Sequence, residues 1–401
     1  MKRTIRILFT ICLLPGLLFW FASCNTDEGP QPTGDKEEYL LNPVSDNSVS
    51  GTVTFERRSD NAVIITIQLN GTDAGGMHPA HIHANNAAEG GSIVLDLNEV
   101  DGATGKSETV VAVFNDQTAL TYEGLIGYDG YVNVHMSSSD LGTLVAQGDI
   151  GQNELTADSE EYMLASVSDP AISGTVTFTK RVNNETLAMI ELTGTTSGSM
   201  HPAHIHSNSA AQGGGIVINL NTVDGATGVS KTNITQTNAG DPLTYADLIA
   251  FDGYVNVHLS STSLATLVAQ GDVGQNELTG DSEEYVLGSV SDPAISGTVT
   301  FSKRVNNETL VVIELIGTAE GASHPAHIHN NSAEEGGGIA INLSNVNGTT
   351  GISKTNVTQT NAEVPLTYAD MIAFDGYVNV HLSSDNLATA IARGNIGANA
   401  P

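Results

Sequence analysis

The sequence predicts an all-β protein that contains three tandem antiparallel β-sandwich or β-barrel domains, each with one short helix. Three features support this fold class: the 401-residue chain repeats itself, each repeat contains short segments of alternating apolar and polar residues, and Gly, Asn and Asp separate these segments. Alternation is typical of half-buried strands, and such turns are typical of antiparallel sandwiches and barrels. A chain of this length can bury a separate core in each repeat.

The N-terminal residues predict export. Lys2, Arg3 and Arg6 precede an apolar run over residues 7–21. This run is shorter than the roughly 20 apolar residues of a membrane-spanning helix, so we expect a cleaved signal peptide. The run leads into FASC, which resembles a bacterial lipobox and predicts Cys24 as the lipidated first residue of the mature chain. The alternative is an ordinary signal peptide followed by an unmodified cysteine.

The repeat defines the domain boundaries. EEYLL at Glu37 recurs as EEYML at Glu160 and as EEYVL at Glu283, at intervals of 123 residues. Only a short polar stretch separates consecutive repeats, so we expect a semi-rigid string of domains that is anchored to a membrane without crossing it. The predicted signal peptide, acidic tether and three repeats span residues 1–23, 24–36, 37–154, 155–277 and 278–401.

Within each repeat the strands follow a fixed order, which the second repeat illustrates. SGTVTFTKRV and TLAMIELTGT alternate on either side of Asn183 and Asn184, which predicts a hairpin with a turn that tolerates positive φ. A Gly-led apolar strand, a cleanly alternating strand and a closing strand follow, over residues 213–220, 253–260 and 265–273.

One helical turn is expected before the alternating strand that ends in histidine. Thr244 is the predicted N-cap, and Asp247 stands three residues later, as in a capping box. Leu248 and Ile249 supply the apolar side of this turn, and Gly253 ends the segment.

The chain is strongly acidic. Lysine and arginine number 14 against 45 aspartate and glutamate residues, which gives a formal net charge of −31. Nucleic acid is therefore not an expected partner, because phosphate binding needs clustered cations. The same deficit argues against electrostatic attachment to an anionic membrane surface. No serine, cysteine or carboxylate arrangement in the sequence is typical of nucleophilic catalysis, so we assign no catalytic residues and expect no enzyme activity.

All twelve histidines fall into three equivalent sets of four, because HPAHIH supplies three histidines and GYVNVH ends in the fourth. Strand alternation places His81 and His83 on one face and directs Ile82 into the core. His135 is presented on a different strand, and His78 could add a fourth nitrogen from the incoming loop. The complete sets are His78, His81, His83 and His135; His201, His204, His206 and His258; and His324, His327, His329 and His381.

This pattern predicts a metal site of three or four histidines in each repeat. Imidazoles from two strands can converge on one ion, because each ring reaches well beyond its backbone and a metal–nitrogen bond measures about 2.0 Å. Imidazole donors without thiolate favour Zn²⁺ or Cu²⁺, up to one ion per repeat, with Ni²⁺ or Fe²⁺ as further possibilities. Two alternatives stay open: histidines that bond to carbonyls or carboxylates at a polar edge, and a surface for a non-metal ligand.

The same motifs resemble a known family. AHIH, a Gly-rich turn, a GIVINL-type strand and YVNVH are similar to the CHRD domain, which is named for the extracellular protein chordin and also occurs in bacterial secreted proteins. The last strand departs from the GEIRGQI-like pattern that is frequent in the family, and it contains an arginine only at Arg393. The resemblance implies a β-rich extracellular module whose biochemical role is poorly defined.

These inferences favour a lipid-anchored binding protein of the cell envelope, on the outer membrane or cell surface, with an unknown protein or polymer as its ligand. Three modules on one string could bind such a ligand with avidity. One alternative is an enzyme similar to copper-zinc superoxide dismutase, although that family needs a disulfide and a guiding arginine for which this chain has no counterpart. The other alternative is a structural or adhesive stalk that binds no metal.

Overall fold

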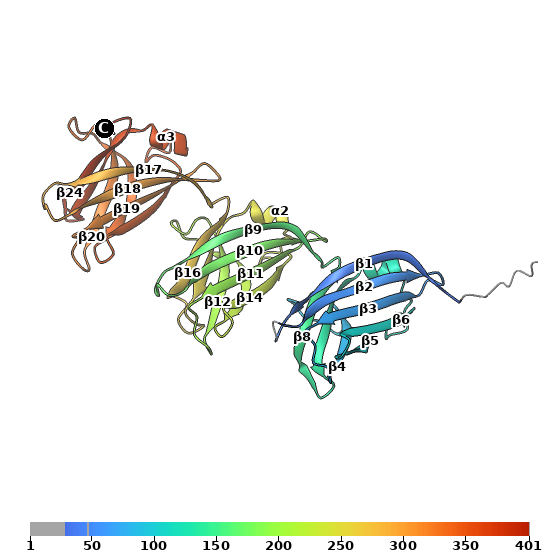
Figure 1. Ribbon diagram of the computed structural model, residues 1–401. Helices are drawn as coiled ribbons and strands as arrows, with labels where there is room; N and C mark the ends of the chain where they lie inside the picture. Colours follow the sequence, from blue (N-terminus) through green and yellow to red (C-terminus); the bar gives the residue numbers. More distant parts are fainter. Residues whose placement is uncertain (1–28, 46–47, 401) are drawn as a thin grey trace, which may run out of the picture.

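The computed structural model describes residues 29–45 and 48–400, which form three β-rich domains arranged in a row (Figure 1). Each domain is an antiparallel sheet of eight strands with one short helix, which confirms the predicted fold class. The first two sheets close into barrels and the third keeps the same strand order, so we refer to all three domains as barrels. The predicted signal peptide and the predicted lipidation site at Cys24 lie outside the described residues.

The first barrel closes through its first and last strands. Neighbouring strands follow the order β1-β2-β3-β6-β5-β4-β7-β8, and β8 pairs with β1 where Gln147 lies opposite Asn42. Strand β1 begins at Pro32, which pairs with Arg58, so the expected tether ends before residue 32. The elements of this barrel are β1 (Pro32–Pro43), β2 (Ser50–Arg58), β3 (Val63–Asn70), β4 (Met77–Ala84), β5 (Ile93–Asp101), β6 (Lys106–Val111), α1 (Tyr122–Ile126), β7 (Asp129–Ser137) and β8 (Asp140–Gly151).

The second barrel repeats this arrangement, with β16 paired to β9. Its elements are β9 (Leu155–Ser166), β10 (Ser173–Arg181), β11 (Thr186–Thr193), β12 (Met200–Ser207), β13 (Ile216–Asp224), β14 (Val229–Ile234), α2 (Tyr245–Ile249), β15 (Asp252–His258) and β16 (Leu267–Gly274).

The third barrel has β21 and β22 as the two end strands of its sheet. Its elements are β17 (Leu278–Ser289), β18 (Ser296–Arg304), β19 (Thr309–Ile316), β20 (Ser323–Asn330), β21 (Ile339–Asn347), β22 (Ile352–Val357), α3 (Tyr368–Ile372), β23 (Asp375–Ser383) and β24 (Asn386–Gly397).

The alternating segments bury one face of each strand in the barrel core. Strands β10 and β11 form the predicted hairpin, with Val176 opposite Ile190 and Phe178 opposite Ala188, and all four side chains are buried. Asn184 in the connecting turn has a φ of 67°, the left-handed conformation that asparagine tolerates better than most residues. Local sequence therefore determines both the register and the turn of this hairpin.

The predicted helix is confirmed together with its cap. The Thr244 side chain accepts a hydrogen bond from the backbone N–H of Asp247, and the Asp247 carboxylate accepts one from the backbone N–H of Thr244. Tyr245 and Leu248 bury the inner side of the helix against the barrel. A helix of five residues is too short to be stable alone, so the capping box and this packing hold it in place.

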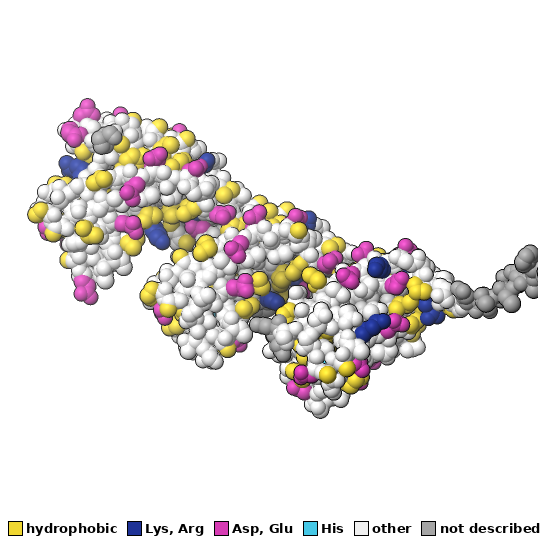
Figure 2. Space-filling model, in the orientation of Figure 1, with side chains coloured by type: hydrophobic (Ala, Val, Ile, Leu, Met, Phe, Trp, Pro, Cys, Tyr) yellow, Lys and Arg dark blue, Asp and Glu magenta, His cyan; other side chains and the backbone are white. Residues whose placement is uncertain are grey.

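Acidic side chains are spread over the visible face of the molecule, whereas lysine and arginine are sparse there (Figure 2). This distribution agrees with the composition and leaves no extended basic surface on that face. Among the described residues, no helix combines the length and the apolar character needed to span a membrane.

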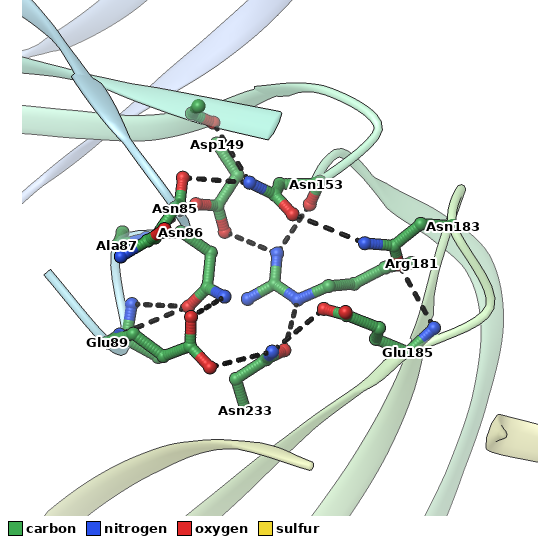
Figure 3. A network of polar contacts seen from close by, with 12 residues as sticks. Asn85, Asn86, Ala87, Glu89, Asp149, Asn153, Arg181, Asn183, Glu185 and Asn233 are labelled. Atoms are coloured by element: carbon green, nitrogen blue, oxygen red, sulfur yellow. Dashed lines mark hydrogen bonds and ion pairs between the residues drawn. The ribbon is translucent and has the colours of Figure 1, made fainter. Parts of the chain in front are cut away.

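Consecutive barrels meet at a buried arginine (Figure 3). Strand β8 ends at Gly151 and β9 begins at Leu155, so only residues 152–154 connect the first two barrels. Arg181, at the end of β10, is completely buried, and its Nη1 donates to Asp149 Oδ2 on β8 over 2.7 Å. The junction is therefore held by side chains from both barrels as well as by the short connection.

The second junction repeats this contact. Arg304 is also completely buried, and its Nη1 donates to Asp272 Oδ2 over 2.8 Å. Its Nε donates to Asn356 Oδ1 over 2.7 Å, as Arg181 Nε does to Asn233 Oδ1 over 2.8 Å. The two junctions thus use equivalent residues in equivalent roles.

Candidate metal centre

Two neighbouring strands position the candidate metal ligands of each barrel. In the first barrel β4 runs antiparallel to β7, so that His81 lies opposite Asn133 and His83 opposite Tyr131. Ile82 has no solvent exposure and packs in the core, which places the two histidines that flank it on the other face of the sheet. His135 follows on β7, two residues beyond Asn133 and therefore on the same face.

The three imidazoles converge as predicted. Each offers one ring nitrogen, and the three nitrogens all lie within 4.8 Å of one another. Nδ1 of His81 lies 3.1 Å from Nε2 of His135. Nitrogens bonded to one ion at about 2.0 Å lie no more than about 4 Å apart, so the three rings would close slightly around a bound ion. The three triads are His81, His83 and His135; His204, His206 and His258; and His327, His329 and His381.

In the first triad, backbone carbonyls determine which nitrogen is free in two of the three rings. Nδ1 of His83 lies 3.0 Å from the carbonyl oxygen of Gly91, and Nδ1 of His135 lies 2.7 Å from that of Leu141. A carbonyl oxygen only accepts, so Nδ1 carries the proton and Nε2 presents its lone pair to the centre of the triad. His81 faces the centre with Nδ1 instead. In metalloproteins, hydrogen bonds from the ring nitrogen that does not bind the metal orient the histidine ligands in the same way.

The third triad contains inward-facing nitrogens that have no hydrogen-bond partner in the described part of the chain. They are Nδ1 of His327 and Nε2 of both His329 and His381, and all three atoms are buried. Buried polar atoms nearly always have a partner, and leaving one without a partner costs about 1–3 kcal/mol. A metal ion bound by these three lone pairs would satisfy all of them at once.

Burial favours the neutral form of two histidines in each triad. It lowers the pKa of His81 below its ordinary value of 6.5, and the adjacent His135 ring lowers it further. Burial also lowers the pKa of His135, although the hydrogen bond to the Leu141 backbone acts in the opposite direction. The equivalent rings in the other two barrels are shifted in the same direction by burial. Neutral imidazole is the form that binds metal, so the fold favours the required protonation state.

The first histidine of each HPAHIH motif stands outside the triad. Nδ1 of His78 lies 3.1 Å from the carbonyl oxygen of His135, and Nδ1 of His201 lies 3.1 Å from that of His258. His324 Nδ1 lies 2.9 Å from the carbonyl oxygen of Leu382. The structure therefore brings together three of the four predicted histidines in each barrel, and the fourth binds the backbone of the strand that carries the last triad member.

Several residues around the triad were not singled out from the sequence. The Tyr131 ring stacks on His83 with centroids 4.9 Å apart, and its hydroxyl accepts a hydrogen bond from the backbone N–H of Gly91. Asn133 places its Nδ2 3.4 Å from His83 Nε2 and accepts a hydrogen bond from Gln147. Alternation in GYVNVH predicts that this tyrosine and asparagine share a face with the last histidine, and this pattern could have identified them as neighbours of the site.

Three buried triads, one per barrel, could thus each hold one metal ion. Three protein nitrogens leave a fourth position of a tetrahedral ion for water or for another ligand. The side chain of His81 is 15% exposed, so the first triad is not sealed from solvent.

Comparison with known proteins identifies the first barrel. A family model described as the CHRD domain matches residues 33–144. No curated protein and no solved structure matches the chain. The second and third barrels repeat the strand order of the first and contain the same two histidine motifs, so the three domains are tandem copies of one unit.

Proposed function

We propose that this chain, whose residues 33–144 form a CHRD domain that the next two barrels repeat, is an exported binding protein with one divalent metal ion in each module. The observation that supports this proposal most strongly is the convergence of three histidines in every barrel, two of them buried and one half-buried, each set contributed by two strands. In the third barrel this arrangement is unfavourable without a bound ion, because three buried ring nitrogens that face the centre of the triad have no hydrogen-bond partner.

The chemistry of the donors favours Zn²⁺ or Cu²⁺. Both cysteines of the sequence, Cys12 and Cys24, lie outside the described residues, and the triads offer imidazole nitrogen alone. Imidazole binds Zn²⁺ and Cu²⁺ well, and Cu²⁺ exceeds Zn²⁺ in intrinsic affinity for such donors. Zn²⁺ in turn suits a set of three histidines with one remaining position.

The cell envelope is the proposed location. The apolar run and the FASC segment that ends in Cys24 favour export and a lipid anchor, which would tether the three barrels to a membrane. The proposed role is binding without catalysis, toward a protein or polymer at the cell surface. Three modules in a row would engage such a repeating partner with avidity.

Elemental analysis tests the metal proposal. The chain, purified without a histidine tag and loaded with Zn²⁺, is expected to retain three ions per molecule, one for each triad. The double substitution His81→Ala and His83→Ala is expected to remove one ion and leave the other two. A chain that retains no Zn²⁺ or Cu²⁺ while its triads are intact would overturn the proposal and favour a stalk that binds no metal.

A further inference from the structure

The three triads are alike, but the residues around them differ. On the basis of the proposed function, we infer that the three sites bind their ions with graded affinity, the first site most tightly and the third most weakly. Two positions determine this order. One is the residue that faces the first triad histidine from the next strand, and the other is the residue that contacts the asparagine of GYVNVH.

Asp96 distinguishes the first site. It lies opposite His81 on β5, and its Oδ1 is 3.8 Å from His81 Nε2. His81 faces the triad with Nδ1, so its Nε2–H points toward the carboxylate. At 3.8 Å this contact is electrostatic and not a hydrogen bond, and the negative charge behind the ligand raises its basicity, which strengthens the metal bond.

The other two barrels have a neutral amide at this position. Asn219 lies opposite His204, and Asn342 lies opposite His327. An amide oxygen can accept a hydrogen bond, but it adds no negative charge near the ion. Asp96 is 69% exposed, so solvent weakens its effect, and we expect the advantage of the first site to be moderate.

Arg393 distinguishes the third site. It lies opposite Asn379 on β23, and its Nε donates to Asn379 Oδ1 over 2.5 Å. In the first two barrels the same contact is made by neutral glutamines, since Gln147 donates to Asn133 over 2.9 Å and Gln270 donates to its asparagine over 2.8 Å. Among the described residues, the third site is therefore the only one with a permanent positive charge at the residue that contacts the asparagine of GYVNVH.

The guanidinium of Arg393 lies beside the tyrosine that stacks on a ligand of the third triad. It lies 5.6 Å from the centroid of the Tyr377 ring, which stacks on His329 at 5.0 Å. A permanent positive charge beside the ligands repels a divalent cation bound to them and so weakens its binding.

The expected differences in metal affinity between the sites follow from the usual effect of residues behind metal ligands. Changes in the residues behind metal ligands alter affinity by about 10–100-fold, and solvent screening favours the lower end of this range. We therefore expect about tenfold between consecutive sites. The protein would then fill its sites in order as the metal concentration rises.

The test measures each site by itself. Zn²⁺ is titrated into the full chain in competition with a chromophoric chelator, using three variants that each keep one intact triad. The other two triads are disabled by the appropriate pair of substitutions among His81→Ala, His204→Ala and His327→Ala. The Kd for Zn²⁺ is expected to rise about tenfold from the first site to the second and again from the second to the third.

Two exchanges are then expected to remove the differences in Kd. Asp96→Asn and Arg393→Gln each introduce the residue that the second barrel already has, so the fold should tolerate both changes. In the single-triad variants they are expected to bring the first and third Kd values to that of the second site. Three bound ions with equal Kd values in the unchanged chain, or Kd values that the exchanges do not move, would overturn the graded order and leave the proposed function intact. A chain without any Zn²⁺ binding would overturn both.

Discussion

The guanidinium of Arg181 in the second barrel is completely buried against the carboxylate of Asp149 in the first barrel, 2.7 Å away (Figure 3). The corresponding arginine of the first barrel, Arg58, has no preceding barrel in the described chain and pairs with Asp60 of its own turn over 2.6 Å. At the other end, Asn395 occupies the position of the junction aspartate in the third barrel. The buried pair therefore occurs only where two barrels meet.

We predict that Asp149→Asn loosens the first junction. The substitution leaves Arg181 buried without its charged partner, which typically costs about 3–5 kcal/mol. The barrel itself should still fold, because Asn395 stands at this position in the third barrel. Distances between spin labels on the first and second barrels should become more broadly distributed in pulsed electron paramagnetic resonance.

The control for this experiment is Arg58→Gln, which changes the equivalent arginine where its side chain is partly exposed at the surface. It should leave the same distance distribution unchanged, because an exposed ion pair contributes little to stability. An unchanged distribution in the Asp149→Asn chain would show that the connection of three residues, and not the buried pair, sets the arrangement of the barrels.

Removal of metal should destabilise the barrels. An ion that binds only the folded state adds about 2.7 kcal/mol to the free energy of unfolding when its free concentration is one hundred times Kd. For a domain of this size, this corresponds to an increase of roughly 10 °C in Tm. Calorimetry of the Zn²⁺-loaded chain with and without a chelator measures this difference. A variant with His81→Ala, His204→Ala and His327→Ala serves as the control, and an equal effect of the chelator on that variant would contradict the prediction.

Much of the candidate metal site can be predicted from patterns of residues that are close in sequence. Alternation along β4 and β7 is sufficient to place His81, His83 and His135 on one face, because the side chains of a strand alternate wherever the strand lies in the fold. The cap formed by Thr244 and Asp247 is equally local, since both partners lie within one helical turn. These features depend on residues that are close in sequence, so a sequence predicts them well.

Other features depend on partners that are distant in sequence. Arg58 and Arg181 occupy equivalent positions, yet one is paired at the surface and the other is buried, because only Arg181 has a preceding barrel in the described chain. His78 has the same strand and motif as the triad members, but the carbonyl oxygen that binds it lies 57 residues away. Periodicity indicates the face that a side chain occupies, and it does not identify the atom that the side chain will meet.

The stability of the metal-free chain should fall in mild acid. Burial lowers the pKa of His81 and His135 in the folded state below the ordinary value of 6.5, so the unfolded chain takes up protons at a higher pH than the folded chain. The contribution of the neutral rings is therefore fully present above pH 6.5 and is lost as the pH falls toward the lowered values. Tm measured between about pH 8 and pH 5 should decline, and it should decline less when the triad histidines are replaced by glutamine. An equal decline in both chains would assign the effect to other groups.

The two kinds of histidine in HPAHIH should respond differently to the same substitution. His81→Asn removes a nitrogen from the triad, so the first barrel should lose its ion while the other two retain theirs. His78→Asn removes the hydrogen bond to the carbonyl oxygen of His135, and an unpaired buried carbonyl costs about 1–3 kcal/mol of stability. This second variant should therefore melt at a lower temperature and still bind three ions per chain at saturating Zn²⁺. Elemental analysis combined with calorimetry separates the two results. Loss of one ion in the His78→Asn chain, with its fold retained, would instead make His78 a fourth ligand that moves into the site when the metal binds.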